Sequence, residues 1–303
     1  MKNAYLSFIL MIFTIAGYGQ TADEYFDRGS AKFNLKDFSG AIGEYTKAIE
    51  INPNFEKAYN NRGLSKSNSQ DFNGAIIDYN QAIVINPKTS AAYINRSLAK
   101  CNLQDFNGAI EDCTKAIDIN PNLAMAFNNR GAAKFYIRDY KGAIVDLTSA
   151  IKIDLKLAEA YAMRGLVRAT LKDNSGAMSD FTKAIDINPK YLDVYDHRGF
   201  LYSELQDFSG AIADFSKVIE LGPKNAEVYR KRGNAKLSLK DFGGAISDYT
   251  IAIEIAPNFA EAYFNRGLVK IKLNQKDSGC MDFSKAGELG LTQAYGAIKE
   301  YCQ

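Results

Sequence analysis

The stretch that decides the fold is residues 56–89, EKAYNNRGLSKSNSQDFNGAIIDYNQAIVINPKT, because its pattern returns along the chain every 34 residues. A small residue marks the same position of each copy: Gly29, Gly63, Ser97, Gly131, Gly165, Gly199, Gly233 and Gly267. An aromatic residue stands four positions earlier: Tyr25, Tyr59, Tyr93, Phe127, Tyr161, Tyr195, Tyr229 and Tyr263. Self-similarity at a fixed period indicates a stack of similar units rather than the two ordinary domains that a length of 303 residues suggests.

Each copy predicts two helices separated by a turn. In the first copy, Tyr25 and Gly29 lie one turn apart on an amphipathic segment, and Asp37 is placed to cap a second helix. That helix ends before Pro53, because proline disfavours helical geometry in the preceding residue and has no amide hydrogen. A single pair cannot bury its apolar faces, so neighbouring pairs must stack. We therefore expect an all-α protein, a right-handed α-solenoid of eight helix-turn-helix units with a C-terminal capping helix.

The period also sets the expected boundaries. The eight repeats are 22–55, 56–89, 90–123, 124–157, 158–191, 192–225, 226–259 and 260–293, and the capping helix is 294–303. The eighth repeat is degenerate, because Gly279, Cys280 and Gly287 depart from the repeat pattern in its second helix. A terminal unit of a finite solenoid is expected to differ in this way.

The repeated pattern resembles the tetratricopeptide repeat (TPR) over almost all of residues 22–293. The matching residues of the second copy are Tyr59, Gly63, Ala75, Tyr79, Ala82 and Pro87, with tyrosine in place of the family's usual tryptophan. Local departures are Ser97 and Cys113 in the third copy, Leu155 for proline in the fourth and Asn174 for an aromatic residue in the fifth. The resemblance implies a non-catalytic scaffold that binds a protein or peptide and mediates interaction or complex assembly.

Charge balance and the single histidine exclude several classes of function. The net charge is +2, from 37 basic and 35 acidic residues, so a mainly electrostatic binder of nucleic acid is not expected. His197 is the only histidine, so no site that needs a pair of histidines can form. We expect no catalysis, no cofactor and no metal. A hydrolase would need a carboxylate pair such as Asp196 with Glu204.

The N-terminus is expected to be a cleavable signal peptide over residues 1–19. Lys2 precedes an apolar run over residues 4–16, and small residues follow at Gly17 and Gly19. A helix of that run spans about 20 Å, short of the roughly 30 Å hydrocarbon core. We expect cleavage before Gln20 and a secreted or periplasmic monomer that is not inserted in a membrane. A retained N-terminal membrane anchor is the alternative.

Arginine precedes the small residue in every repeat: Arg28, Arg62, Arg96, Arg130, Arg164, Arg198, Arg232 and Arg266. An acidic residue follows each arginine sixteen positions later: Glu44, Asp78, Asp112, Asp146, Asp180, Asp214, Asp248 and Asp282. One hypothesis makes the arginines a track for a polyanion. We favour a ladder of ion pairs that fastens the two helices of each repeat, because every arginine has its own acidic residue.

The resemblance also implies a ligand site, since the first helices of TPR units line a concave groove that holds peptides. The groove positions in the middle repeats are Ile94, Leu98, Asn128, Asn129, Ala132, Phe135, Ala162 and Leu166. Apolar side chains and amides suit an extended or helical peptide. Two alternatives remain open. These residues pack only between neighbouring first helices, or aromatic residues such as Phe135, Tyr136 and Phe200 bind a carbohydrate.

Acidic residues begin the first helices of the last four repeats: Glu159, Asp193, Glu227 and Glu261. They form either a rim for basic ligand residues or a complement to the helix dipole. We favour the dipole, to which an acid in the first turn contributes about 0.3 to 1 kcal/mol.

A carboxylate clamp is a further predicted site near the C-terminus. Co-chaperones of this family hold a peptide's terminal carboxylate with basic residues and asparagines on successive repeats. The residues near those positions are Arg230, Asn234, Asn265 and Lys299. Cations and amide donors suit a carboxylate, although arginine replaces a lysine and Tyr295 replaces another basic residue.

The four cysteines allow two disulfides in an oxidising compartment. Cys280 and Cys302 lie at similar distances from the turn between their helices, so we expect these two to be able to pair. Cys101 and Cys113 belong to one helical hairpin, and their positions are offset by about 6 Å along the helix axis. That offset is marginal for a disulfide. Buried thiols are the alternative for both pairs.

Overall fold

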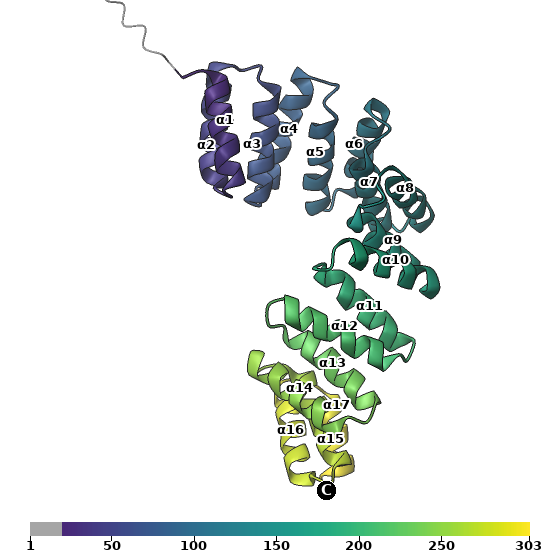
Figure 1. The fold of residues 1–303 in the computed structure, drawn as a ribbon. Coiled ribbons are helices and arrows are strands. Elements are labelled where there is room, and N and C mark those ends of the chain that lie inside the picture. Colours follow the sequence, from purple (N-terminus) through teal and green to yellow (C-terminus); the bar gives the residue numbers. More distant parts are fainter. Residues whose placement is uncertain (1–19) are drawn as a thin grey trace, which may run out of the picture. The chain divides into compact units, whose positions relative to one another are not determined.

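The computed structural model describes residues 20–303, and the expected signal peptide lies outside the described residues. Seventeen α-helices and no strands make up the described part, which confirms the all-α class (Figure 1). The helices are α1 (Ala22–Asn34), α2 (Phe38–Ile51), α3 (Glu56–Asn68), α4 (Phe72–Ile85), α5 (Ser90–Asn102), α6 (Phe106–Ile119), α7 (Ala124–Tyr136), α8 (Tyr140–Ile153), α9 (Ala158–Thr170), α10 (Asn174–Ile187), α11 (Leu192–Glu204), α12 (Phe208–Leu221), α13 (Ala226–Ser238), α14 (Phe242–Ile255), α15 (Ala260–Lys272), α16 (Lys276–Glu288) and α17 (Gln293–Tyr301).

The chain divides into two compact bodies. The N-terminal body ends at Pro121 and holds α1 to α6, and the C-terminal body begins at Asn122 and holds α7 to α17. Within each body, consecutive helices pack as pairs, and each pair packs on the next along the chain (Figure 1). No helix among residues 20–303 is long and apolar enough to span a membrane.

Each second helix from α2 to α14 begins with an aspartate cap. In the second repeat, the carboxylate of Asp71 accepts a hydrogen bond from the amide of Gly74 at 2.9 Å. A Cβ atom at Gly74 would overlap that carboxylate in its present position. The same arrangement holds in the other repeats with this cap: Asp37, Asp105, Asp139, Asp173, Asp207 and Asp241. In the eighth repeat Gln275 precedes α16 and makes no cap hydrogen bond with its side chain.

The turn before each second helix contains a residue in the left-handed region that is not glycine. These residues are Lys36, Gln70, Gln104, Arg138, Lys172, Gln206, Lys240 and Asn274, with φ between 59° and 65°. Such a conformation is uncommon for residues with a side chain, because Cβ crowds the backbone. Proline is not required at the other end of the second helix. α8 ends at Ile153, in register with the other repeats, although Leu155 replaces the proline.

Glycine in the first helix makes room for a ring on the second. Six second-helix rings are at most 1 % exposed: Tyr45, Tyr79, Phe181, Phe215, Tyr249 and Phe283. Each ring lies against the glycine sixteen residues before it, where a Cβ atom would come within 2.6 to 2.9 Å. The largest apolar cluster lies in the C-terminal body and extends from Ala143 on α8 to Leu201 on α11.

Candidate functional site

Two adjoining cavities lie on the face that the first helices form in the C-terminal body. One cavity, of about 280 Å³, has residues of α7, α9 and α11 in its wall. The other, of about 300 Å³, is lined mainly by α9 and α11. Leu166 of α9 and His197 of α11 contribute to both cavities, so the two are neighbours across these side chains. We call the first the acidic cavity, because Glu159 and Asp193 line it, and the second the apolar cavity, because Phe181 and Phe200 line it.

The apolar cavity takes its name from its phenylalanine residues, and Thr170, Lys172, Asn174 and Glu204 stand at its polar side. Leu166, Phe181 and Phe200 line it, and the Phe200 side chain is 55 % exposed. The His197 ring lies parallel to the Phe181 ring, with centroids 6.1 Å apart. Fixed rings with an exposed edge suit an apolar side chain of a ligand.

The acidic cavity holds two carboxylates, two phenol groups and an amide. Glu159 at the start of α9 and Asp193 at the start of α11 line it together with Tyr136, Tyr191 and Asn128. Burial raises the pKa of Tyr191 above its ordinary value, and the charges of Glu159 and Asp193 act in the same direction. The Tyr191 hydroxyl therefore stays protonated in a negative local field.

Three of the predicted groove residues lie in the acidic cavity, namely Asn128, Ala162 and Leu166. Leu98 lies instead in a cavity of about 230 Å³ between α3 and α5, in the N-terminal body. Asn129 is 4 % exposed, and its amide oxygen accepts a hydrogen bond from Asn128. Ile94 and Ala132 are half-buried.

Phe135 fits the packing alternative better than a ligand contact. Its half-buried ring lies 5.5 Å from the Tyr136 ring and 5.7 Å from the Tyr140 ring. Tyr191 and Val194 were not anticipated in the site. Tyr191 stands in the turn before α11, where the repeat pattern places no ligand contact, so no signal in the sequence identifies it.

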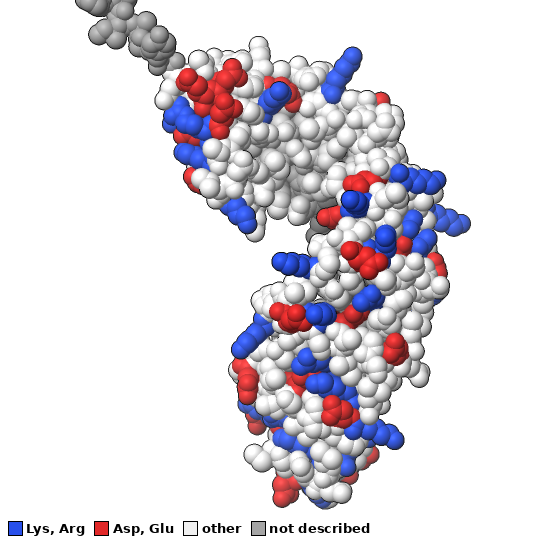
Figure 2. Space-filling view, in the orientation of Figure 1, with Lys and Arg blue, Asp and Glu red and all other residues white. Residues whose placement is uncertain are grey.

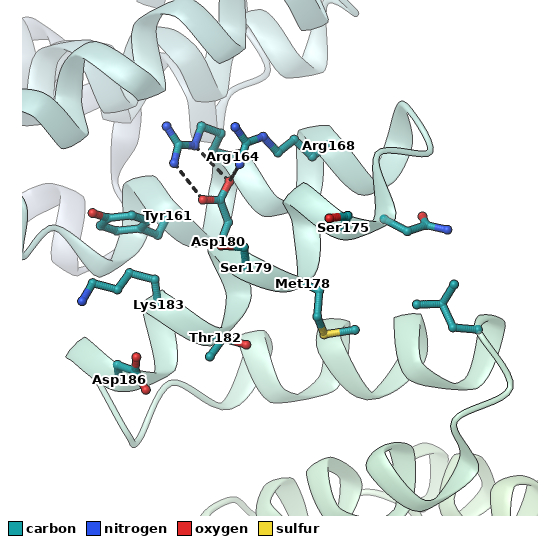
Figure 3. A pocket seen from close by; sticks show the side chains of 12 residues that line it. Tyr161, Arg164, Arg168, Ser175, Met178, Ser179, Asp180, Thr182, Lys183 and Asp186 are labelled. Carbon is teal, nitrogen blue, oxygen red and sulfur yellow. Dashed lines mark hydrogen bonds and ion pairs between the residues drawn. The ribbon is translucent and has the colours of Figure 1, made fainter.

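The arginine column forms ion pairs within the repeats, which confirms the ladder. Arg164 Nε and Nη2 donate to the two oxygens of Asp180 at 2.9 and 2.8 Å (Figure 3). The same two-bond pairing joins the other six arginine–aspartate pairs, which are Arg62–Asp78, Arg96–Asp112, Arg130–Asp146, Arg198–Asp214, Arg232–Asp248 and Arg266–Asp282. In the first repeat Glu44 lies 3.8 Å from Arg28 and 3.0 Å from Lys32.

A second cation, one turn further along the first helix, binds the same aspartate in most repeats. Arg168 takes this place beside Asp180, at the wall of an open hollow of about 940 Å³ (Figure 3). The other such residues are Lys66, Lys100, Lys134, Lys236 and Lys270. In the sixth repeat Tyr202 stands at this position, and Asp214 pairs among the described residues with Arg198 alone.

The arginines also connect neighbouring repeats. Arg62 Nη1 donates to Thr46 Oγ1 of the preceding repeat at 3.1 Å, and Arg232 Nη1 donates to Ser216 Oγ at 3.0 Å. With carboxylates and hydroxyls bound, these guanidinium groups do not form a polyanion track. Figure 2 likewise shows basic and acidic side chains interspersed over the face in view.

The predicted clamp residues are partly engaged with one another. Asn234 Oδ1 accepts hydrogen bonds from Asn265 Nδ2 at 3.0 Å and from the Tyr249 hydroxyl at 2.7 Å. Arg230 forms an ion pair with Glu227 in its own helix. Lys299 is exposed on α17. The clamp remains a prediction, because nothing in the structure shows how these groups meet a carboxylate.

The carboxylates considered for hydrolysis do not face each other as a pair. Both oxygens of Asp196 accept hydrogen bonds from Lys231 at 2.8 Å, whereas Glu204 lines the apolar cavity. No group of three or more histidine, cysteine, aspartate or glutamate side chains within residues 20–303 is arranged to hold a metal ion.

The structure joins Cys280 of α16 to Cys302 after α17 in a disulfide, with Cα atoms 5.8 Å apart. Cys101 and Cys113 remain thiols. Burial raises the pKa of Cys101 to about 11, with a smaller contribution from the charge of Asp105. This thiol is therefore protonated and unreactive at neutral pH.

Comparisons with known proteins agree with this architecture. The Tetratricopeptide repeat family model matches residues 23–55, 56–89, 90–123, 158–191 and 192–225, and a TPR repeat model matches residues 233–274. The chain belongs to the tetratricopeptide repeat family. This fold is a common scaffold for protein–protein interaction, and TPR scaffold proteins are generally not enzymes.

Several solved structures share the fold. A tetratricopeptide repeat protein from Parabacteroides merdae is 21% identical, with a TM-score of 0.60 over 83% of this chain and 99% of that chain. Pseudomonas aeruginosa pilF is 19% identical, with a TM-score of 0.60 over 67% and 92%. The Cut9–Hcn1 assembly of the APC/C is 16% identical, with a TM-score of 0.60 over 95% and 57%. No curated protein matches the chain.

Proposed function

We propose that this protein is a non-catalytic scaffold that binds a protein or peptide segment in the groove lined by the first helices of the C-terminal body. The observation that carries the proposal is the pair of adjoining cavities at Leu166 and His197. They place apolar, aromatic and amide groups side by side, which is the chemistry that holds a peptide's side chains and backbone.

A carbohydrate site is less well supported by the same residues. A sugar-binding platform needs an accessible aromatic face. The half-buried Phe135 ring packs against the Tyr136 and Tyr140 rings, so each of the two adjoining cavities presents a single exposed ring, Tyr136 in one and Phe200 in the other. We therefore retain the peptide hypothesis alone.

Site-specific crosslinking tests the groove. A photoreactive amino acid replaces Phe200 in the groove or Met281 on α16, and both native side chains are well exposed, at 55 % and 73 %. Both variants are expressed in the source cells and irradiated. We expect covalent adducts with a protein partner from position 200 only. Adducts that form only from position 281 would overturn the groove assignment.

We further propose that the protein acts outside the cytoplasm as a monomer. The support is the charged start, apolar run and small residues of residues 1–19. Mass spectrometry of the protein from the cell envelope is expected to find Gln20 at its N-terminus, and light scattering the mass of one chain. An intact N-terminus in the membrane fraction would favour the anchored alternative.

A further inference from the structure

Two acidic residues of the groove carry a charge that the described part of the protein does not neutralise. Glu159 and Asp193 come from successive first helices and line one cavity. Neither carboxylate has an ion pair or hydrogen bond with any residue of 20–303 that the structure describes. The equivalent residue of the seventh repeat, Glu227, is instead neutralised by Arg230 in its own helix. Both carboxylates are exposed in the first turns of α9 and α11, at equivalent positions of successive repeats, and both face one cavity without a partner among the described residues.

An unsatisfied amide oxygen lies in the wall of the same cavity. Asn128 is only 9 % exposed, and its Nδ2 donates to Asn129 Oδ1 at 3.3 Å. Its Oδ1 has no hydrogen-bond donor among the described residues. A buried acceptor without a donor costs about 1 to 3 kcal/mol, and a donor from a ligand in the cavity would offset that cost.

Aromatic rings give the acidic cavity a third feature that favours a cation. Tyr136, which is 57 % exposed, and the half-buried Tyr191 both line it. Ring faces attract ammonium and guanidinium groups, in addition to the attraction by carboxylates. The residues lining this cavity include no lysine or arginine. An acidic or phosphorylated side chain would meet two like charges here and no cation.

We propose that the acidic cavity binds a lysine or arginine side chain of the ligand and that the apolar cavity binds a neighbouring apolar side chain of the same segment. The ligand is thus a peptide segment in which a basic residue lies close to an apolar one. The inference rests on the proposed function, because it assigns the ligand's chemistry to the same groove. The shared residues Leu166 and His197 make the two subsites adjacent.

A displayed library of random peptides, selected on the full chain, tests this assignment. We expect the selected peptides to pair lysine or arginine with an apolar residue. One selected peptide is then labelled, and its lysine is replaced by norleucine, which keeps the length and removes the charge. We expect this replacement to weaken binding about tenfold, as for loss of a charge that is desolvated on binding.

Protein variants locate the effect. In Glu159→Gln with Asp193→Asn, both carboxylates become neutral at almost unchanged shape, and we expect lysine and norleucine peptides to bind equally. The matched control, Glu227→Gln with Glu261→Gln, removes the same charge from the seventh and eighth repeats and should keep the tenfold preference. All four positions are at the start of helices and away from the core, so both variants are expected to fold.

The outcomes separate the two proposals. Groove binding of peptides without a basic residue, or equal affinity of the lysine and norleucine peptides, overturns the assignment of the acidic cavity and leaves the scaffold proposal intact. An equal loss of preference in the control variant also overturns it, because the effect would then come from overall charge. Peptides that bind only outside the groove, as crosslinking from position 281 would show, overturn both.

Discussion

The Tyr79 ring lies so close to the backbone of Gly63 that a Cβ atom on Gly63 would stand 2.7 Å from Tyr79 Cε1. Tyr79 is fully buried, so a shift of its ring would displace the residues packed around it. We expect Gly63→Ala to lower the free energy of unfolding by about 1 to 3 kcal/mol, the usual cost of overpacking a core. Urea unfolding monitored by circular dichroism measures it. The control is Gly43→Ala, because a Cβ atom there meets nothing within 4 Å.

The third repeat has the reverse size pattern at the two positions equivalent to Gly63 and Tyr79. Ser97 replaces the glycine and buried Cys113 replaces the ring, so a larger residue in the first helix accompanies a smaller one in the second. Gly63→Ser with Tyr79→Cys should therefore be less destabilised than the sum of the two single variants. Additive losses would show that the two positions do not compensate each other.

Aspartates with two cations should be harder to replace than the aspartate with one. Asp248 binds Arg232 and Lys236, whereas Asp214 binds Arg198 among the described residues. We expect Asp248→Asn to cost about 3 to 5 kcal/mol, because it leaves two partly buried cations unpaired. Asp214→Asn should lower the free energy of unfolding by at least about 1 kcal/mol less than Asp248→Asn does, because it leaves one cation unpaired and not two. Denaturant titrations at pH 7 compare the two variants, and equal losses would contradict this account.

Buried tyrosines predict a loss of stability in alkali. Burial raises the pKa of Tyr79 to about 12, with the Asp78 charge adding to the effect, and burial also raises the pKa of Tyr249. An unfolded tyrosine titrates near pH 10, so the folded state favours the neutral phenol. The contribution to stability is complete below pH 10 and is lost as the pH rises through the folded value.

The free energy of unfolding should therefore fall above pH 10, by at most about 1.4 kcal/mol per pH unit for each such tyrosine. Tyr79→Phe with Tyr249→Phe is expected to make the decline between pH 10 and 12 shallower. The exposed Tyr136→Phe serves as the control and should leave the slope unchanged. An identical slope in the double variant would rule out these two phenols as the cause.

The disulfide between Cys280 and Cys302 should hold α17 against α16. It closes a loop over a sequence separation of 22, for which a stabilisation of about 3 kcal/mol is typical. Cys302→Ser should raise amide hydrogen exchange in α17 and leave α9, far along the chain, unaffected. Besides the disulfide, Tyr295 donates to the Gly287 carbonyl at 3.1 Å. Unchanged exchange in α17 would mean that such contacts suffice.

The sequence predicts the repeat architecture well because each repeat carries its own signals. Asp37 as a cap and the pairing of arginine with acidic residues follow from residue type and spacing, and the structure confirms both. The second cation, at Lys66 and its equivalents, also recurs every 34 residues and was visible in the sequence, but was not anticipated.

Other features depend on three-dimensional detail that spacing does not contain. The left-handed residues such as Gln70 carry ordinary polar side chains, so nothing in their type marks the conformation. The acidic cavity depends on the position of the Tyr191 side chain relative to α9 and α11. It also depends on which carboxylates have no ion-pair partner. The position of Phe135 in the repeat predicts a groove contact. In the structure its ring instead packs against the Tyr140 ring, which repeat position alone does not indicate.

Because Arg62 reaches back to Thr46 and Arg96 reaches back to Asn80, successive repeats within a body are joined by an arginine of one repeat and a hydroxyl or amide of the repeat before it. A segment of one full period thus contains both halves of the junction. Tandem duplication of such a segment within the gene would regenerate this arginine hydrogen bond at the one new boundary without any further substitution. The array is thereby built to lengthen by copying itself.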